Sequence, residues 1–476
     1  MNKIHKKSLV WLRRDLRLHD NTAIFNASNE TSLVTLCFVF DKNILDQLND
    51  PEDRRVEFIK TILDDIRSNL NSIQSDIWIL YGDPLTEIPK LASKIKADAV
   101  YVNRDYEKYG VLRDEKVKSI LNEDNINFYS FKDQVLFEAD EILTQKEAPY
   151  SVFSPYRNNH LSKLTITGSG YLNYNYKKIT FEKFILEKNY SLNDLGFKKT
   201  NLSSIAISTK ADDIQNQIKD FKTRIEKYDR LRNFPAIKGV SYLSVHNRFG
   251  TISIREIADI CLNNISSGSK SWLNELIWRD FYFQIIGNFP HVQDGLTFKE
   301  QYNNLQYENK LSFFDAWKNG MTGFPIVDSA MRQLNQTGFM HNRLRMIVAS
   351  FLTKDLLIDW RWGEQYFKDK LIDYDFSANN GGWQWAASVG CDAQPWFRIF
   401  NPLLQSKKFD PEGTFIKKYI PELSMLDKKT IHDPHASKAD NPSKNSYPHP
   451  IIDHSIQRKK ALEMFEKVNN VVKKQH

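Results

Sequence analysis

The chain has 476 residues, of which 41% are hydrophobic and 26% are charged, and its formal net charge is +7. This is the composition of a globular protein of two or three domains, and the lack of any run of 18 apolar residues excludes a membrane span. The apolar stretch at residues 9–12 is too short for a signal-peptide core, and three distant cysteines argue against a disulfide framework or a zinc site. We therefore expect a cytoplasmic protein, and the positive charge is compatible with nucleic acid as a partner.

Strand-like and helix-like segments alternate through the first 130 residues. Short apolar runs rich in β-branched or aromatic residues predict strands at 8–12, 33–40, 76–81, 99–102 and 126–129. Amphipathic stretches at 55–70 and 85–95 predict helices, and Pro84 after Gly82-Asp83 marks a helix start. The alternation predicts an α/β domain with a doubly wound parallel sheet. No G-x-G-x-x-G follows the first strand, so we do not expect the main dinucleotide in this domain.

The pattern changes at two later points of the chain. Between residues 131 and 217, polar stretches such as 158–176 and 193–209 have weak periodicity, which predicts a long, irregular interdomain connection. From residue 218, apolar residues recur every three or four positions, as at 272–286, 326–337, 343–357 and 363–371. We expect an α/β domain at 1–130, a connection at 131–217 and a larger all-α domain at 218–476.

The segment W-L-N-E-L-I-W-R-D-F-Y at residues 272–282 has an unusual helical face. Glu275, Trp278, Arg279 and Tyr282 fall at positions i, i+3, i+4 and i+7. Spacing alone allows a partly buried helix with an internal Glu275–Arg279 pair. It equally allows a pocket wall in which an aromatic ring lies beside a hydrogen-bonding group.

Two further segments combine polar and aromatic residues. In H-N-R-L-R-M at residues 341–346, Asn342, Arg345 and Met346 share a face while Arg343 points elsewhere, so the arginines can serve two partners or form ordinary surface ion pairs. In L-I-D-Y-D-F-S-A-N-N-G-G-W-Q-W-A-A-S at residues 371–388, closely spaced polar groups suit hydrogen bonding to a heterocyclic cofactor. A metal site there is a poor match because it would have only two carboxylates and no histidine.

The segment W-F-R-I-F-N-P at residues 396–402, with 405–408, mixes rings and cations. This mixture is typical of nucleic-acid contact, where rings stack on bases and cations meet phosphates, and also of many protein interfaces.

Together these segments closely resemble the DNA photolyase and cryptochrome family, and within it the microbial (class I) photolyases that act on cyclobutane pyrimidine dimers. The resemblance begins with W-L-R-R-D-L-R-L-H-D at residues 11–20. It continues through T-G-F-P-I-V-D-S-A-M-R-Q-L and the four segments above, so that it covers essentially the whole chain.

The resemblance implies an α/β antenna domain and a helical domain that binds FAD. By motif, Tyr228 and the loop Val240, Ser241, Tyr242, Leu243 and Ser244 would hold the FAD phosphates. Arg345, Asp373, Tyr374, Asp375 and Asn379 would bind the flavin side, with Arg345 paired to Asp373 and Asn379 facing the flavin N5.

The resemblance also implies contacts with UV-damaged DNA. Glu275 would hydrogen-bond the carbonyl groups of the flipped dimer, and Trp278 and Trp385 would stack on it. The other residues expected at the dimer pocket or the DNA are Arg232, Arg279, Asn342, Arg343, Met346, Arg398 and Gln405. The implied reaction is light-driven electron transfer from reduced FAD to the dimer, with ring opening and return of the electron.

Three positions depart from the family pattern. The tryptophan chain that reduces the flavin maps its inner members onto Trp383 and Trp360, but its outermost position falls on Tyr307, so the route could instead use Trp362 or Trp317. Val240 stands where a hydroxyl residue is usual. Tyr109-Gly110 and Asp294 replace the residues of folate-binding relatives, which leaves the antenna chromophore open between methenyltetrahydrofolate, an 8-hydroxy-deazaflavin, a flavin and none.

The alternative to a repair enzyme is a cryptochrome-type blue-light photoreceptor without repair activity. Glu275, Asn342, Met346 and Asn379 favour repair. A photolyase for (6-4) photoproducts is disfavoured because H-N-R-L-R-M lacks the expected histidine pair, and a light-independent flavin oxidoreductase is disfavoured because no nicotinamide motif is present. We expect no metal, no membrane partner and a monomer.

Overall fold

The structure is a computed structural model, and it describes residues 3–187, 189–205, 207–436 and 446–475. The chain folds into two compact units. Unit 1 comprises Met1–Tyr150, Ser154–Glu226 and Ser241–Asn288, and unit 2 comprises Ser151–Phe153, Lys227–Val240 and Phe289–His476. The division into domains at 1–130, 131–217 and 218–476 stays a prediction, and residues 188 and 206 of the expected connection lie outside the described residues.

Unit 1 contains a five-stranded parallel sheet with the order β3-β2-β1-β4-β5. All five predicted strands are confirmed, with small shifts at their ends, as β1 His5–Leu12, β2 Thr31–Asp41, β3 Ile77–Gly82, β4 Ala99–Asn103 and β5 Asn127–Phe131. Val10 of β1 pairs with Leu36 on one side and Tyr101 on the other. The strand order therefore reverses at β1, which is the switch point of a doubly wound sheet.

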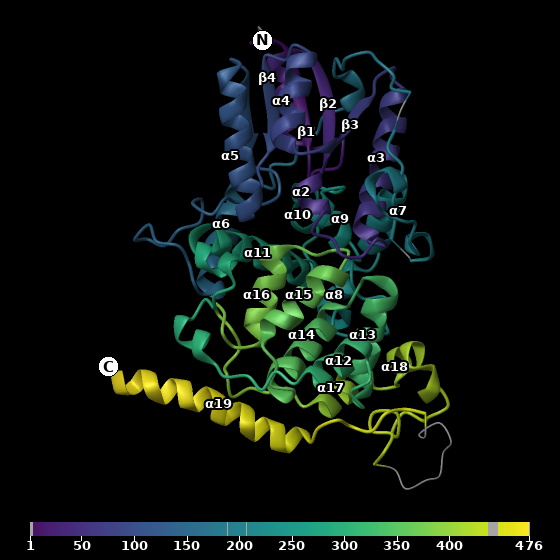
Figure 1. The fold of residues 1–476 in the computed structure, drawn as a ribbon, viewed down its shortest axis with the longest axis vertical. Coiled ribbons are helices and arrows are strands. Elements are labelled where there is room, and N and C mark those ends of the chain that lie inside the picture. The colour runs from purple at the N-terminus through teal and green to yellow at the C-terminus, as the bar shows by residue number, and fades with distance from the viewer. Residues whose placement is uncertain (1–2, 188, 206, 437–445, 476) are drawn as a thin grey trace. The chain divides into compact units, whose positions relative to one another are not determined.

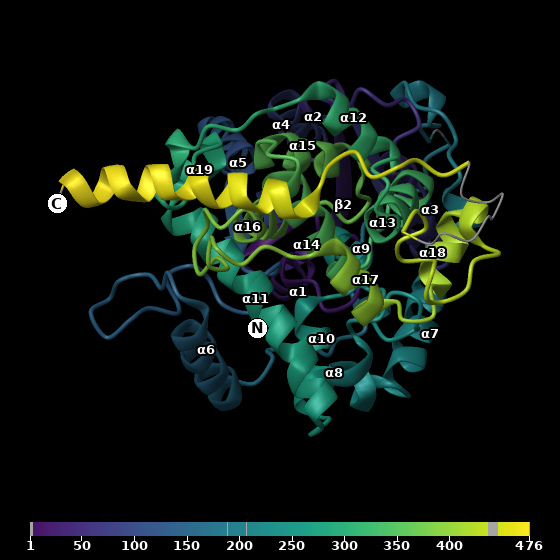
Figure 2. The same cartoon turned by 90° about the horizontal axis from the view of Figure 1, so that it is seen from below.

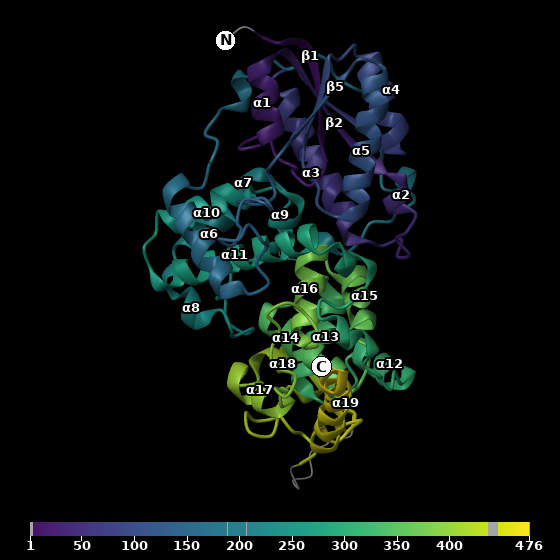
Figure 3. The ribbon, with the colours of Figure 1, turned by 90° about the vertical axis from the view of Figure 1, so that its left-hand side faces the viewer.

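Helices cover both faces of this sheet, as predicted. The order of strands and right-handed crossovers place α1 on one face and α4 and α5 on the other, an arrangement visible in Figure 3. Pro84 is the first residue of α4, and the Asp83 side chain caps that helix by accepting from Leu85 N. The helices of this part are α1 Thr22–Glu30, α2 Lys42–Leu45, α3 Arg54–Asn71, α4 Pro84–Lys94 and α5 Lys108–Glu123.

The polar stretch after β5 is more regular than the sequence predicts. Helix α6, Phe153–Thr167, includes ten residues of the stretch 158–176, which was expected to be irregular. The first turns of α6 pack against the rest of unit 1, because His160 is completely buried and bonds to Asp280. Farther along, Phe181 is buried and pairs with Val34 as an isolated bridge, so the segment packs along the sheet.

The rest of the described chain is helical, which confirms the all-α prediction (Figure 1). The remaining helices of unit 1 are α7 Ala211–Lys222, α9 Ser244–Phe249, α10 Ile254–Leu262 and α11 Ser267–Asn288. Those of unit 2 are α8 Tyr228–Leu231, α12 Leu311–Asn319, α13 Pro325–Thr337, α14 Asn342–Ser350, α15 Trp360–Lys370, α16 Phe376–Ala386, α17 Pro402–Phe409, α18 Thr414–Tyr419 and α19 His454–Gln475.

Unit 2 is organised around a buried aromatic and aliphatic core. Trp317, Trp360 and Trp383 belong to this core and are almost fully buried. Helix α19 lies across unit 2 (Figure 2) and contributes Phe465 to the same core. Eight of the ten tryptophans lie at residues 272–396, and packing in this core accounts for these three.

The helix predicted at 343–357 is interrupted. Helix α14 ends at Ser350 and continues as a π-helical turn, η7, at Phe351–Asp355. The extra residue in a π turn changes which side chains face inward, and such turns are frequent at functional sites.

Among the helices in the described ranges, none has the length and apolar character needed to cross a membrane.

Candidate functional site

The residues expected at the site are divided between the two units. Ser241, Tyr242, Leu243, Ser244, Glu275, Trp278 and Arg279 belong to unit 1, and all the others belong to unit 2. Each group has its own geometry.

In unit 1, helix α11 has one face that is only half-buried. Glu275, Trp278 and Tyr282 lie on this face, whereas Leu276, Ile277 and Phe281 point into the core. The rings of Trp278 and Tyr282 lie one turn apart with centroids separated by 5.7 Å. Glu275 shares this face with the two rings, and its role in a pocket wall stays a prediction.

Arg279 lies on the same helix but is used inside the unit. Its Nη1 donates to the carbonyl of Gln134, and its guanidinium lies 4.5 Å from the ring centroid of Phe283. The neighbouring Asp280 is completely buried and accepts from Leu136 N at 2.9 Å. These contacts fix the rotation of α11, which leaves Arg279 less suited to contact DNA than the sequence implies.

The loop expected to hold phosphates begins α9. Tyr242 has a left-handed backbone with φ of +59°, and Gln217 Nε2 donates to the carbonyls of Ser241 and Tyr242 at 3.2 and 2.9 Å. The carbonyl oxygens are therefore occupied, and Ser244 is exposed at the start of the helix.

In unit 2, the two arginines of helix α14 have different partners. Arg345 Nη2 contacts both carboxylate oxygens of Asp373, at 2.7 and 3.0 Å, which is the predicted pair. Arg343 instead donates to Asn233 Oδ1 at 2.8 Å, and its guanidinium lies 4.5 Å from the ring centroid of Phe409. Asn342 is exposed and Met346 is half-buried on the same helix.

His341 caps this helix, because its Nδ1 accepts from Arg343 N at 3.2 Å. Burial, together with the positive charges of Arg343, Arg345 and Arg232, lowers the pKa of His341 to about 4. The imidazole is therefore neutral at pH 7, as an acceptor at Nδ1 must be.

Helix α16 carries the polar groups expected near a flavin. Asp375 is its N-cap and accepts from Ala378 N at 3.2 Å. Asn379 Nδ2 donates to Glu364 Oε1 at 3.0 Å and to the Glu364 carbonyl at 3.1 Å. This fixes the amide so that its oxygen is the atom left for an outside donor. One turn on, a Cβ added at Gly382 would meet no atom within 4 Å, so there is open space beside Asn379.

These groups fit FAD. The carboxylates of Asp373 and Asp375 can accept from N–H groups, the Arg345 guanidinium can meet an anion, and Asn379 offers an acceptor beside open space. They are a poor set for a metal, because Arg345 already occupies the carboxylate of Asp373.

The aromatic residues expected to carry electrons lie in the core of unit 2. Trp383 packs against Gly363, where a Cβ would lie 2.1 Å from the indole ring, so only glycine permits this approach. Trp360 begins the same helix, α15, and Tyr307 packs against the core that contains Trp360. The Tyr307 hydroxyl is buried without a hydrogen-bond partner among the described residues, and burial raises its pKa.

Trp317 offers a second aromatic contact to Trp383. Their ring centroids are 6.1 Å apart, and Trp317 continues to Tyr366 at 5.7 Å. Trp362 joins this group through Phe314, at 5.2 Å.

The residues expected at the DNA are accessible in unit 2. Arg398 is exposed beside Phe397, a residue that is 59% exposed, and Arg232, Trp385 and Gln405 are half-buried. The mixture of a ring and a cation at 397–398 is that of a nucleic-acid contact.

The antenna positions in unit 1, Tyr109 and Gly110, lie beside charged side chains. At the switch point, the guanidinium carbons of Arg13 and Arg113 lie over the Trp11 ring, 4.8 and 4.9 Å from its centroid. Both arginines bond to Asp114. A Cβ at Gly110 would lie 2.5 Å from Asp105 Cγ, so a glutamate at position 110 would require Asp105 to move.

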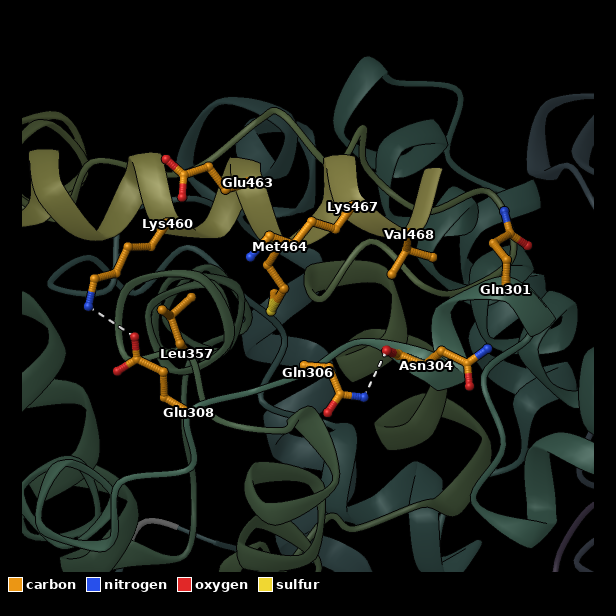
Figure 4. A pocket seen from close by; sticks show the side chains of 10 residues that line it. All are labelled: Gln301, Asn304, Gln306, Glu308, Leu357, Lys460, Glu463, Met464, Lys467 and Val468. Carbon is orange, nitrogen blue, oxygen red and sulfur yellow. Dashed lines mark hydrogen bonds and ion pairs between the residues drawn. The ribbon is translucent and has the colours of Figure 1, made fainter. Parts of the chain in front are cut away.

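A cavity of about 650 Å³ lies between α19 and the segment that precedes α12 (Figure 4). Lys460 of α19 bonds to Glu308 at 2.9 Å across it. Its lining residues are Gln301, Asn304, Gln306, Glu308, Leu357, Lys460, Glu463, Met464, Lys467 and Val468. None of these is a predicted site residue.

The sequence reasoning missed residues that act on the site through others. Glu364 holds the Asn379 amide and Asn233 holds Arg343. Both are far in sequence from their partners, so no spacing pattern reveals them.

Comparisons with known proteins cover nearly the whole chain. A family model described as "DNA photolyase" matches residues 8–171, and one described as "FAD binding domain of DNA photolyase" matches residues 272–467. A curated protein of Alkalihalophilus pseudofirmus named deoxyribodipyrimidine photo-lyase is 40% identical, covering 96% of this chain and 97% of its own. One of the same name from Vibrio cholerae is 36% identical, covering 96% and 99%.

Solved structures are similar over the same length. A class III photolyase from Agrobacterium tumefaciens has a TM-score of 0.87 and 31% identity, covering 99% of this chain and 98% of its own. A photolyase from Sulfolobus tokodaii with two FAD molecules has a TM-score of 0.80 and 33% identity, covering 97% and 100%. A cryptochrome from Synechocystis has a TM-score of 0.83 and 25% identity, covering 98% and 100%.

Proposed function

The chain belongs to the DNA photolyase family, and from this premise we propose that it repairs cyclobutane pyrimidine dimers in DNA with light and bound FAD. It is a deoxyribodipyrimidine photo-lyase, a carbon–carbon lyase. The observation that carries the proposal is the polar site of unit 2, where Arg345 is paired to Asp373 and the Asn379 amide is fixed by Glu364.

FAD supplies the light-driven electron transfer to the dimer, and the protein supplies binding and orientation. Asp373, Tyr374, Asp375 and Arg345 hold the flavin side, and Tyr228 with the loop at 240–244 holds the phosphates. Asn379 presents its side-chain carbonyl oxygen to the flavin N5 position. A hydrogen-bond acceptor there favours the flavin with a proton on N5. The Glu364 contacts support this orientation because they use the Nδ2 donor.

The roles that we propose at the dimer and the DNA are as follows. In unit 1, Glu275 hydrogen-bonds the dimer carbonyls and Trp278 stacks on the dimer. In unit 2, Trp385 stacks on it, and Asn342 and Met346 line its pocket. The residues that contact the DNA backbone are Arg232, Arg343, Arg398 and Gln405, with Arg279 in a supporting place because its guanidinium is used within unit 1. The protein acts as a monomer in the cytoplasm.

Electrons reach the cofactor through Trp383 and Trp360. Tyr307 is a poor outer donor because its hydroxyl has no described acceptor for the proton that oxidation releases. The contact of Trp317 with Trp383 supports a branch through Trp317 and Trp362.

The second chromophore stays open between methenyltetrahydrofolate, an 8-hydroxy-deazaflavin, a flavin and none, because Tyr109-Gly110 stands where folate-binding relatives have an Asn-Glu pair. The photolyase of Sulfolobus tokodaii contains two FAD molecules, so a flavin is one candidate for unit 1. The absorption spectrum of the native protein after subtraction of FAD distinguishes a folate, a flavin, a deazaflavin and an empty site.

The function is tested with purified protein containing reduced FAD. We expect it to restore dimer-containing single-stranded and duplex DNA under blue light and to leave the same DNA unchanged in darkness. If FAD is bound and no light-dependent repair occurs, the photoreceptor alternative, to which the similarity with the Synechocystis cryptochrome points, replaces repair.

A further inference from the structure

Lys354 is a lysine with no exposed surface. It lies in the π turn η7, and 0% of the residue is accessible. Its Nζ donates to Ser388 Oγ at 2.7 Å and to the carbonyl of Arg398 at 3.0 Å. The amino group of Lys354 therefore joins Ser388, two residues past the end of helix α16, to the exposed arginine expected at the DNA.

Burial of this ammonium group is unfavourable for the free energy of folding. Among the residues that the structure describes, no carboxylate lies within 4.0 Å of its Nζ, although Asp355 adjoins it in sequence. Removing a charge from water without a paired counter-ion is unfavourable, and burial lowers the pKa of Lys354 to about 7. An apolar side chain of the same length would fill the space without this cost, so packing alone does not account for a lysine.

The two acceptors belong to segments that need an anchor. Ser388 has a left-handed backbone with φ of +66° and follows the helix that carries Trp383 and Trp385. Arg398 lies in an irregular stretch between α16 and α17, and its own N–H bonds to the Pro395 carbonyl at 2.9 Å. A nearby ring, Trp396, stacks on Phe465 of α19 with centroids 6.1 Å apart.

The π turn anchors α19 as well. Asp355, the residue after Lys354, bonds to His454 at 2.5 Å, and its carbonyl accepts from Gln457 Nε2 at 2.7 Å. Two neighbouring residues of the π turn therefore bind two segments. Lys354 binds the irregular stretch that contains Arg398, and Asp355 binds α19, against which Trp396 packs.

We propose that Lys354 is a positioning residue that fixes the stretch 389–401 against the end of α16, so that Arg398 and Phe397 are held in place for DNA. The proposal rests on DNA being the substrate. Lys354 acts through the stretch and not on the dimer, so its loss weakens binding without changing repair within the bound complex.

The test compares the FAD-loaded protein with Lys354→Met, Lys354→Gln and Ser388→Ala, with Thr353→Val as the matched control. Thr353 is buried in the same turn, but its hydroxyl bonds only to Ala349 and Ser350 within the helix. Two quantities are measured in the dark: the hydrogen-exchange rate of amides 389–401 without DNA, and the Kd for dimer-containing duplex. Repair yield at saturating DNA is measured in light.

For Lys354→Met we expect faster exchange in 389–401 and a Kd raised about 10-fold, the loss of roughly one charge-assisted hydrogen bond. FAD content and the repair yield at saturation should be unchanged. Lys354→Gln keeps an N–H donor, so its affinity for DNA should lie between those of Lys354→Met and the wild type. Ser388→Ala should lose less affinity than Lys354→Met, and combining the two substitutions should weaken binding little more than Lys354→Met alone. Thr353→Val should match the wild type.

Unchanged exchange in 389–401, or equal losses in Thr353→Val, overturns the proposal. If Lys354→Met does not fold, the exchange rate and the Kd of Ser388→Ala test the proposal, because this variant removes one of the two acceptors of Lys354 Nζ. If exchange rises as expected but the wild type itself does not bind dimer-containing DNA, the positioning role holds and the proposed function fails.

Discussion

Arg343 and Arg345 are two residues apart on helix α14, yet their guanidinium groups have different partners. Helical geometry turns one toward Asn233 and the other toward Asp373. A residue's role in this protein therefore depends on the face that it occupies more than on its type.

Replacing each of these arginines separates cofactor binding from DNA binding. Arg345→Ala removes the partner of the buried Asp373 carboxylate, and we expect FAD retention to weaken about 10- to 100-fold, as for loss of a charged hydrogen bond. Arg343→Ala is the matched control and should keep FAD while weakening DNA binding. Absorbance at the flavin bands after gel filtration measures FAD content, and equal losses in both variants contradict the assignment.

Glu275 is expected to stabilise charge that develops on the dimer. Glu275→Ala should lower the repair yield by about an order of magnitude or more, by comparison with lost hydrogen-bond donors in other active sites, while FAD content stays intact. Glu275→Gln offers an amide N–H donor in place of the carboxyl group and should retain more repair than Glu275→Ala. Loss of FAD in either variant would show that Glu275 belongs to the cofactor site.

At the scale of elements, helix α14 is held at its start by a neutral histidine. The folded pKa of His341 is about 4, below the ordinary value of 6.5, so the unfolded chain binds more protons between these values. Stability from this group is present above about pH 6.5 and is lost as the pH falls toward 4.

We expect the contribution of His341 to the free energy of unfolding of the wild type to fall by about 2 kcal/mol between pH 7 and pH 5. His341→Asn keeps an N-cap without titrating, so its stability should fall less over the same range. Urea midpoints of both proteins at the two pH values measure the difference. His246, which is also buried with a pKa lowered to about 4, contributes equally to both and cancels. If the urea midpoints of the two proteins change equally with pH, a neutral His341 does not cap helix α14.

At the scale of the whole molecule, the net charge of +7 is too small to specify a partner by itself. What matters is where the cations lie. Arg232, Arg343 and Arg398 all belong to unit 2, and Arg398 is exposed beside an exposed ring.

If these three arginines each meet one phosphate, the affinity for duplex DNA should fall with a log–log salt slope of about −2.7. This slope corresponds to roughly 40-fold weaker binding at 200 mM than at 50 mM salt. Arg398→Ala should reduce the slope by about 1. Lys318→Ala, which removes a lysine already paired with Asp315 on α12, should leave it unchanged. Fluorescence anisotropy at four salt concentrations measures the slope, and one that is insensitive to Arg398 excludes this residue from the phosphate contacts.

The sequence by itself determined the five strands of the sheet and the helical character of the second half of the chain. The strands of unit 1 are short apolar runs between turn residues, and the helices of unit 2 repeat apolar residues every three or four positions, so local periodicity predicts both. The Arg345–Asp373 pair was also predicted, by resemblance of consecutive motifs, and the face of Glu275 and Trp278 by helical spacing alone.

Only the tertiary structure decided which polar groups are already in use. Arg279 is bound to Gln134, Asn379 to Glu364, and Lys354 to Ser388 and Arg398, over separations of 15 to 145 residues. Helix α6 was missed because its polar residues follow no clear period, and burial of His160 against Asp280 helps to hold it in place. Periodicity reports which side of an element is apolar, whereas the partner of a buried polar atom depends on which distant segments fold together.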